Sequence, residues 1–329
     1  MQVVLPVAGF GSRMRPHTWS KPKPLLHVAG NTVLGHTLDK LADLNVDEVI
    51  FITGWLGEQI QDWVKRRYRF NARYVVQEKL EGQAHAIHLA KDYLSGPCLV
   101  IFVDTIFEGN LAMLETATTD GVIYIQEVDD PRDFGVVVEE NGRVVRYIEK
   151  PDTLEHRKTT VGVFWFRDGR QLVSAVDHML EKDIRTKGEF YLADAVNVML
   201  SRGAHFISEP VTLWEDCGQP ETILKTNRTL LAHGHASASV QGTHCVIIPP
   251  VYVAPSAQLE NAIIGPYVSI DENARIVSSI VRNSIIESGA VIENSTLENS
   301  LIGRRALVRG RIDQLNIGDN ATVGDHADA

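Results

Sequence analysis

The last third of the chain carries an apolar periodicity that few folds can satisfy. From about Val246 onward, single apolar residues recur at intervals of five or six positions almost throughout. They are Val253, Leu259, Ile264, Ile270, Ile276, Val281, Ile286, Ile292, Leu297, Ile302, Val308, Ile312, Ile317 and Val323. An amphipathic helix repeats its apolar residues every 3.6 positions and a half-buried strand every second position, so neither explains the pattern. A period near six is typical of a hexapeptide β-helix, whose coils are triangles of short strands.

The repeat also suggests how the 329 residues divide into domains. Corners led by Asn or Ser recur at Asn261, Ser278, Asn294 and Asn316, a spacing near three hexads that allows about four coils. We therefore predict a parallel β-helix domain over residues 235–329 and a separate domain over residues 1–234, in keeping with roughly 150 residues per domain. Because a repeat array leaves apolar ends or faces, we expect a homo-oligomer.

The first 234 residues alternate apolar strand-like runs with helix-like segments. The runs begin at Val3, Val49, Tyr74 and Leu99, and the helix-like segments span residues 32–44, 59–69, 84–94 and 191–202. Continuous apolar strands separated by helices indicate an α/β fold with a Rossmann-like, mostly parallel sheet covered on both faces. Further strand-like runs at residues 121–125, 134–139, 144–149, 162–166 and 208–213 predict some antiparallel additions to its second half.

Composition argues against several classes of partner. Lys and Arg number 32 against 42 Asp and Glu, a net charge of −10, whereas a general nucleic-acid binder is usually basic. Apolar runs stay well short of the roughly 18 residues of a membrane span, and the N-terminus lacks the features of a signal peptide. The three cysteines lie far apart without metal-binding spacing, which suits a reducing compartment. We expect a cytoplasmic protein with neither nucleic-acid nor membrane partners.

The turn after the first strand carries the chemistry. Its sequence is Ala8-Gly9-Phe10-Gly11-Ser12-Arg13-Met14-Arg15-Pro16. Glycines let the backbone close around phosphates, a following helix start would offer amide donors, and Arg13 can grip phosphate oxygens with two hydrogen bonds. A dinucleotide-binding loop would need a third glycine where Met14 stands, and a Walker loop would need Gly-Lys-Ser/Thr. Lys23, between two prolines about ten residues later, makes a phosphate site more specific than a plain tight turn with a solvated lysine.

Two segments, Gly9-Phe-Gly-Ser-Arg-Met-Arg-Pro16 and Lys21-Pro-Lys-Pro-Leu25, resemble the signature of the sugar-1-phosphate nucleotidylyltransferases, or NDP-sugar pyrophosphorylases. The similarity continues in order along essentially the whole chain. It is greatest to glucose-1-phosphate thymidylyl- and uridylyltransferases that carry a left-handed β-helix tail. The resemblance implies an enzyme that condenses dTTP or UTP with a sugar 1-phosphate, most simply glucose 1-phosphate, to give an NDP-sugar and pyrophosphate.

The resemblance also implies roles for individual residues. Arg13 would stabilise the departing pyrophosphate, and Lys23 would bridge the α-phosphate and the incoming sugar phosphate. Mg²⁺ would be held by Asp104, which follows the apolar run Val100–Val103, and by Asp216 in Trp214-Glu-Asp-Cys-Gly218. The nucleotide would contact Ala8, Gly9, Gly11, Ser12, Arg13, Gln77 and Gly82. The sugar phosphate would contact Gly135, Glu149, Lys150 and Val161.

Each of these residues also has a structural alternative. The two aspartates could be turn formers, Gln77 a polar strand end, and Glu149 with Lys150 a surface pair of little energetic weight. Gln77 can pair with the imide edge of a pyrimidine, but thymine and uracil share that edge, so the choice between dTTP and UTP stays open.

Two other functions remain for the chain as a whole. It could be a non-catalytic sugar-nucleotide-binding regulatory or assembly subunit, although such a protein has no need of both metal-binding acids. It could also carry an acyltransferase activity in the β-helix, which requires a base such as histidine near the coils. The sequence holds no histidine between His244 and His326, which disfavours this second activity.

Overall fold

The computed structural model describes residues 1–310 and 312–324, and its packing separates into two compact units. The sheet unit comprises Met1–Gly9 and Thr37–Trp214, and the coil unit comprises Phe10–His36 together with the chain from Glu215 onward. The residues Phe10–His36, here called the signature segment, therefore belong to the coil unit although the strand before them belongs to the sheet unit. The predicted domains, residues 1–234 and 235–329, are continuous in sequence, unlike these two units, and they stay a prediction.

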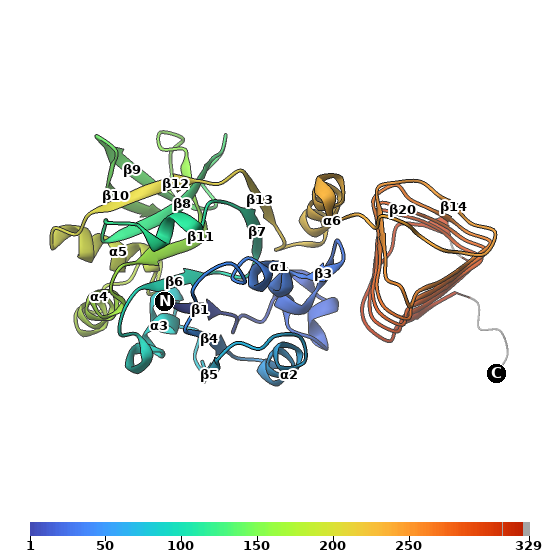
Figure 1. Ribbon diagram of the computed structural model, residues 1–329, viewed down its shortest axis with the longest axis horizontal. Helices are drawn as coiled ribbons and strands as arrows, with labels where there is room; N and C mark the ends of the chain where they lie inside the picture. The colour runs from blue at the N-terminus through green and yellow to red at the C-terminus, as the bar shows by residue number, and fades with distance from the viewer. Residues whose placement is uncertain (311, 325–329) are drawn as a thin grey trace. The chain divides into compact units, whose positions relative to one another are not determined.

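A nine-stranded sheet, in the order β5-β4-β1-β6-β11-β8-β12-β10-β9, forms the centre of the sheet unit (Figure 1). Its strands are β1 (Gln2–Pro6), β4 (Glu48–Thr53), β5 (Ala72–Val76), β6 (Cys98–Ile101), β8 (Gly121–Glu127), β9 (Gly135–Glu140), β10 (Arg143–Glu149), β11 (Lys158–Phe166) and β12 (Phe206–Pro210). A short pair, β7 (Thr105–Glu108) and β13 (Leu213–Asp216), forms a separate two-stranded sheet.

Strand direction changes halfway across this sheet. The strands β5, β4, β1 and β6 are parallel neighbours, as predicted. From there on only β12 and β8 run parallel, while β11 is antiparallel to β6 and β8, and β10 is antiparallel to β12 and β9. A parallel sheet is therefore confirmed for the first four strands only, the antiparallel additions predicted for the second half are also confirmed, and the fold is mixed α/β. The strands β9 and β10 are antiparallel because a tight turn joins them, and its residues Asn141 and Gly142 both have positive φ.

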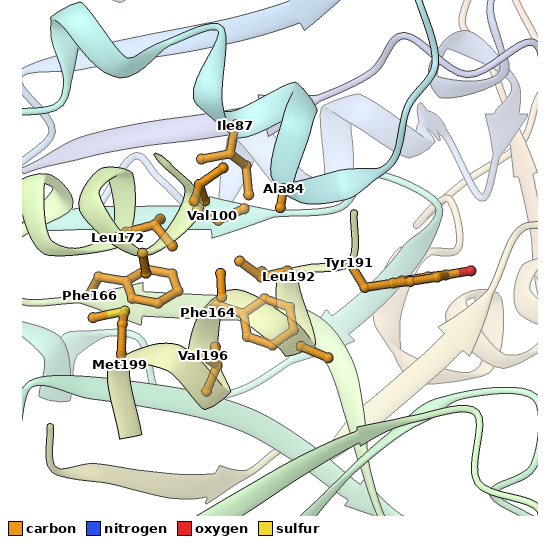
Figure 2. Close-up of a cluster of buried hydrophobic side chains, with 14 of the residues drawn as sticks. Ala84, Ile87, Val100, Phe164, Phe166, Leu172, Tyr191, Leu192, Val196 and Met199 are labelled. Atoms are coloured by element: carbon orange, nitrogen blue, oxygen red, sulfur yellow. The ribbon is translucent and has the colours of Figure 1, made fainter. Parts of the chain in front are cut away.

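Three helices cover one face of the sheet. They are α3 (Gln83–His88), α4 (Gly169–Lys182) and α5 (Leu192–Ser201), and they pack against one another. Figure 2 shows Phe164 and Phe166 of β11 among Leu172 of α4 and Val196 and Met199 of α5, in one buried apolar cluster. Alternate residues of each strand point to opposite faces, and both faces of β1 are buried, which explains its continuous apolar run.

Two other helices of the chain lie at or near the sheet unit. Helix α2 (Gly57–Arg67) buries Ile60, Trp63 and Val64, and α1 (Val33–Asp39) begins in the coil unit and ends in the sheet unit. Both start within two residues of the predicted helices, but α1 ends five residues earlier than predicted. No helix in the described part of the chain is long and apolar enough to cross a lipid bilayer.

Three five-stranded parallel sheets form the coil of the coil unit, and Figure 1 shows it as a stack of triangles. The first sheet contains β14 (Val246–Ile247), β17 (Ile263–Ile264), β20 (Ile280–Arg282), β23 (Thr296–Glu298) and β26 (Ile312–Asp313). The second contains β15 (Val251–Val253), β18 (Val268–Ile270), β21 (Ile285–Ile286), β24 (Leu301–Ile302) and β27 (Asn316–Ile317). The third contains β16 (Gln258–Glu260), β19 (Arg275–Val277), β22 (Val291–Glu293), β25 (Leu307–Arg309) and β28 (Thr322–Val323).

The coil repeats every 15 to 17 residues. Val246 pairs with Ile263, 17 positions on, and Ile280 pairs with Thr296, 16 positions on, so each turn is shorter than the 18 residues of three full hexads. Each sheet has five strands, which gives five rungs instead of about four. The predicted apolar positions between 259 and 308 all lie in the buried core of the coil.

Left-handed residues make the corners of the coil. One column consists of Asn261, Ser278 and Asn294, all with φ near +50°, as the sequence predicted. Asparagine tolerates this conformation better than most residues, because its short side chain adds little steric strain. The fourth predicted corner is wrong: Asn316 is the first residue of β27, and the column continues at Gly310, with φ of 63°.

The coil unit also contains helix α6 (Pro220–Leu230) and a small hairpin of the signature segment, β2 (His27–Val28) and β3 (Asn31–Thr32). Helix α6 begins with a capping box, in which Gln219 and Thr222 satisfy each other's backbone amides. It packs against β2 and against β18 of the coil. The helix thus links the signature segment to the coil within one compact unit.

Candidate functional site

A left-handed glycine shapes the signature loop. Gly11 has φ of 62° and ψ of 34°, and a Cβ there would lie 3.0 Å from Cβ of Lys23 and 3.1 Å from Cγ2 of Thr18. The hydroxyl of Thr18 donates a 2.8 Å hydrogen bond to the carbonyl of Gly11. Glycine at this position lets the two halves of the signature approach each other, so the structure brings the predicted residues Gly11 and Lys23 together.

The helix expected after this loop is a single 3₁₀ turn, Ser12–Met14. Arg15 returns to the extended conformation, with ψ of 142°, as the residue before a proline is biased to do. The loop can therefore offer individual amide groups to a phosphate, but it lacks the dipole of a long helix. Ser12 and Arg13 are exposed, whereas Arg15 places its guanidinium 3.9 Å from the centre of the Trp19 ring.

Lys23 begins the 3₁₀ turn Lys23–Leu25 and is half-buried between Pro22 and Pro24. Lys21, two positions earlier, is buried and forms an ion pair with Glu287 of the coil. Burial is the main cause that lowers the pKa of Lys21 to about 8. The two lysines of one motif thus differ in burial: Lys21 is buried beside a carboxylate of the coil, whereas Lys23 is only half-buried.

The predicted base-binding residues lie in the sheet unit, between β5 and α3. Gln77 directly follows β5, is buried, and donates its backbone N–H to the carbonyl of Thr53 at 2.7 Å. Gly82 has φ of 115°, and a Cβ there would lie 2.5 Å from the carbonyl oxygen of Phe190 and 2.6 Å from its nitrogen. The Phe190 backbone also bonds Glu81 at 3.0 Å, so this turn tolerates only glycine at position 82.

The predicted sugar-binding residues come from three neighbouring strands. Gly135 at the start of β9 pairs directly with Glu149 at the end of β10, and Val161 lies buried in β11. A Cβ at Gly135 would lie 2.5 Å from the ring of Tyr147. Lys150 has φ of 47° and donates its backbone N–H to the carbonyl of Phe134 at 2.9 Å. Strand register therefore brings Gly135 and Glu149 together.

The carboxyl group of Glu149 has an unusual protonation equilibrium. Burial raises its pKa to about 7, Lys150 and Lys187 oppose the increase, and Asp194 and Glu189 add to it. A pKa near 7 means that the group can be neutral or ionised at physiological pH. Because ionised carboxylates are strong hydrogen-bond acceptors, the capacity of Glu149 to accept hydrogen bonds depends on pH.

The two predicted metal ligands belong to different units. Asp104 lies in the turn between β6 and β7 of the sheet unit, and Asp216 ends β13 in the coil unit. One oxygen of Asp216 accepts the backbone N–H of Gly218 at 2.9 Å, which orients the carboxylate. Within residues 1–310 and 312–324, no three His, Cys, Asp or Glu side chains cluster as a metal cage. Single carboxylates suit Mg²⁺, which substrate phosphates usually help to hold.

Comparison with known proteins places the chain in a family. Residues 2–233 match the family described as Nucleotidyl transferase. The chain belongs to this family. A Haloferax volcanii protein named low-salt glycan biosynthesis nucleotidyltransferase Agl11 is 29% identical over 99% of both chains. A glucose-1-phosphate thymidylyltransferase from Streptomyces antibioticus is 28% identical over 99% of this chain and 98% of its own.

Other relatives are longer than this chain. A bifunctional protein GlmU from Methanococcus maripaludis is 27% identical over 89% of this chain, which spans 62% of that protein's length. Among solved structures, a UDP-glucose pyrophosphorylase complexed with UDP-glucose has a TM-score of 0.61 at 18% identity, over 70% of this chain and 98% of its own. At 18% identity, this structural similarity shows a shared fold alone.

The sequence did not reveal the polar residues that hold the signature segment. Asn227 of α6 is completely buried, and Glu287 and Asp319 of the coil have side chains that are 7% and 1% exposed. The sequence offered one signal: an acidic residue stands one or two positions after a strand of the coil, where the side chain is buried. The partner of such an acid lies more than 260 positions away in sequence, which periodicity cannot indicate.

Proposed function

We propose that the chain transfers a nucleotidyl group from dTTP or UTP to a sugar 1-phosphate, most simply glucose 1-phosphate. The observation that carries the proposal is the geometry of the signature loop. Glycine at position 11 lets Lys23 pack directly against the loop, and Arg13 is exposed. Membership of the nucleotidyl transferase family and a relative named glucose-1-phosphate thymidylyltransferase support the reaction class and the substrate.

In the proposed reaction, an oxygen of the sugar phosphate attacks the α-phosphorus of the nucleoside triphosphate in line. A new P–O bond forms as the bond to the α–β bridging oxygen breaks, and that electron pair leaves with pyrophosphate. Arg13 stabilises the negative charge on the leaving group, and Lys23 bridges the α-phosphate and the attacking phosphate. Such chemistry depends on positioning and charge neutralisation and needs no covalent enzyme intermediate.

Asp104 and Asp216 would hold Mg²⁺, whose charge supplies further neutralisation at the phosphates. Gln77 and the backbone at Gly82 would recognise the pyrimidine, together with the loop residues Ala8, Gly9 and Ser12 for the phosphates. Gly135, Glu149, Lys150 and Val161 would recognise the sugar phosphate. Each role is supported by the motif to which the residue belongs and by its surroundings within its own unit.

The test is pyrophosphate release over a grid of nucleoside triphosphates and sugar 1-phosphates. We expect Arg13→Ala to lower kcat/KM by about 1,000-fold, because an exposed guanidinium aimed at developing charge contributes on that scale. Arg15→Ala is the matched control: this arginine stacks on Trp19 in the same loop, and we expect less than about a threefold loss. Full activity of a folded Arg13→Ala protein would refute the assignment, and binding without turnover would favour a regulatory subunit.

We also propose that the coil is a left-handed β-helix of the hexapeptide type and that it promotes self-association. The three parallel sheets and the left-handed corner residues support the first point. Exposed Val246 and Ile248, near the first rung, support the second. Sedimentation equilibrium of the full chain tests it, and a monomer at micromolar concentration would contradict it.

A further inference from the structure

A buried cluster of charges joins the signature segment to the coil. The ammonium group of Lys21 forms an ion pair with Glu287 and lies 3.8 Å from a carboxylate oxygen of Asp319. Arg304 lies 3.4 Å from the other oxygen of Asp319, and Asp271 contributes a further negative charge. The side chains of Lys21 and Glu287 are both 7% exposed. Lys21, Glu287 and Asp319 are therefore shielded from solvent, unlike an ordinary surface ion pair.

Contacts of the residues just before Lys21 extend the junction. The Ser20 hydroxyl donates a 2.6 Å hydrogen bond to Asp319, and Nε2 of His17 donates to the side-chain oxygen of Asn316 at 2.7 Å. Burial lowers the pKa of His17, which favours its neutral form. A Cβ on Gly318 would lie 3.0 Å from Pro16, so a glycine in the coil lets the segment approach closely.

The far end of the signature segment has its own polar anchor. The side-chain oxygen of Asn227, in α6, accepts hydrogen bonds from the Ala29 N–H at 2.9 Å and from the Ser269 hydroxyl at 2.6 Å. Its amide donates to the carbonyl of Tyr267 at 3.2 Å. One buried side chain thus connects the segment, the helix and the coil. The segment between residues 16 and 29 is held at both ends by contacts within the coil unit.

These contacts specify position more than they add stability. Removing two charges from water costs several kcal/mol per ion, and a buried pair seldom exceeds an apolar pair of the same size in net stability. A buried pair does penalise displacement, because a shift of either partner leaves an uncompensated charge. Lys23 follows Lys21 by two residues, and its Cβ abuts the position of Gly11. Fixing Lys21 therefore fixes the loop that carries the proposed catalytic lysine.

We propose that the coil sets the position of the signature loop, and that Lys21, Glu287 and Asp319 are positioning residues for nucleotidyl transfer. The inference rests on the proposed function for its catalytic consequence. The anchoring itself is a property of the coil unit alone. The competing role for Lys21 is direct contact with a substrate phosphate, which its family motif would equally allow.

A double-variant cycle in the full chain separates the two roles. The variants are Lys21→Met, Glu287→Met and the combination of both, measured by kcat and KM for the nucleoside triphosphate. Each single variant leaves a buried charge without its main partner, and we expect each to lower kcat by about 100-fold, because small misplacements cost this much. The double variant removes both charges, and we expect its kcat to return to within about threefold of wild type.

Direct phosphate contact predicts another pattern. Lys21→Met and the double variant would then be equally inactive, while Glu287→Met would keep most of its activity. That result would overturn the positioning role. Glu293→Gln is the matched control, because Glu293 also forms ion pairs within the coil, at 2.7 Å with Arg275 and with Arg309, but has no part in the junction. We expect its kcat to be unchanged.

Amide hydrogen exchange of residues 10–26 supplies a readout that needs no substrate. We expect faster exchange in both single variants, exchange near the wild-type rate in the double variant, and no change in Glu293→Gln. Wild-type exchange in Glu287→Met would refute the anchoring whatever the activity. An inactive wild-type protein would refute the proposed function, and the exchange data would still decide whether the coil holds the loop.

Discussion

The signature segment and the strands that carry the predicted sugar-binding residues place their side chains in two different ways. In the coil unit, buried charges and hydrogen bonds from Lys21 and Asn227 attach a loop to a repeating scaffold. In the sheet unit, strand register opposes Gly135 to Glu149, and close packing against Tyr147 leaves room only for glycine. The first arrangement is specified by polar partners and the second by steric fit. Mutations should therefore act on them differently.

The largest of these effects is expected at Gly82, where an added Cβ would meet main-chain atoms. Gly82→Ala places a Cβ about 2.5 Å from the Phe190 backbone at a positive φ, and we expect a loss of about 3 kcal/mol in the free energy of unfolding. Gly9→Ala is the control, because a Cβ there meets nothing within 4 Å. Urea denaturation measures both. Equal stability of the two variants would mean that the turn at position 82 is not constrained by packing.

Polar anchoring is tested with two buried or half-buried asparagines. Asn227→Ala leaves three polar groups of the coil unit without their partner, and we expect a loss of about 2 kcal/mol with faster amide exchange in the signature segment. Asn197→Ala in the sheet unit removes hydrogen bonds of 2.9 and 2.7 Å to the Tyr147 backbone. We expect a similar loss of stability there, but no change in exchange of the signature segment. Equal exchange in both variants would contradict a specific anchor.

Glu149 makes the stability of the sheet unit depend on pH. Its pKa is about 7 in the folded protein against an ordinary value of 4.5, so the folded state binds the proton more tightly than the unfolded state. Stability from this group is therefore lost as pH rises from about 4.5 to 7. Glu149→Gln removes the loss, and we expect the variant to gain on the order of 1 kcal/mol over wild type between pH 4.5 and 8, after allowing for partial solvent screening. Parallel stability curves would exclude a shifted Glu149.

The smallest effect is expected for an exposed polar contact of the coil. Glu293→Gln weakens two ion pairs whose arginine side chains are 44% and 39% exposed. We expect a change below about 1 kcal/mol, because such pairs are screened by water and salt. Thermal unfolding at low and high salt measures it. A loss as large as that of Asn227→Ala would mean that exposed and buried polar contacts of the coil are equivalent.

Periodicity predicted the regular parts of the fold from sequence. The predicted apolar positions from Leu259 to Val308 are confirmed because they face one common core. The first four parallel strands are confirmed, and β1, β4 and β6 are buried on both faces. Helix α4 was missed although Leu172, Val176 and Met179 have helical spacing and Asp168 caps its first turn. The two strands of the antiparallel hairpin were predicted within one residue of their observed bounds, and Asn141-Gly142 between them is a strong turn signal.

Only those features of the candidate site that lie within short sequence motifs were predictable. The glycines at 11, 82 and 135 stood out in motifs, and the structure gives each a steric reason. The roles of Arg13, Lys23, Asp104 and Asp216 stay predictions that the proposed assays test. The anchors could not be predicted, because Lys21 and Glu287 are brought together only by the assembled coil, across 266 positions of sequence.

The 15- to 17-residue repeat of the coil has a consequence for how such a chain can change in length. Repeat arrays usually tolerate the gain or loss of a whole rung, because each rung contacts only its neighbours. In this coil, however, particular rungs carry the side chains that contact the signature segment. Glu287 follows β21, and Asp319 follows β27 two rungs later. Deleting one rung would leave a well-formed coil that presents the wrong side chains to the loop. The rungs are therefore alike in structure, but they are not interchangeable in their contacts with the signature segment.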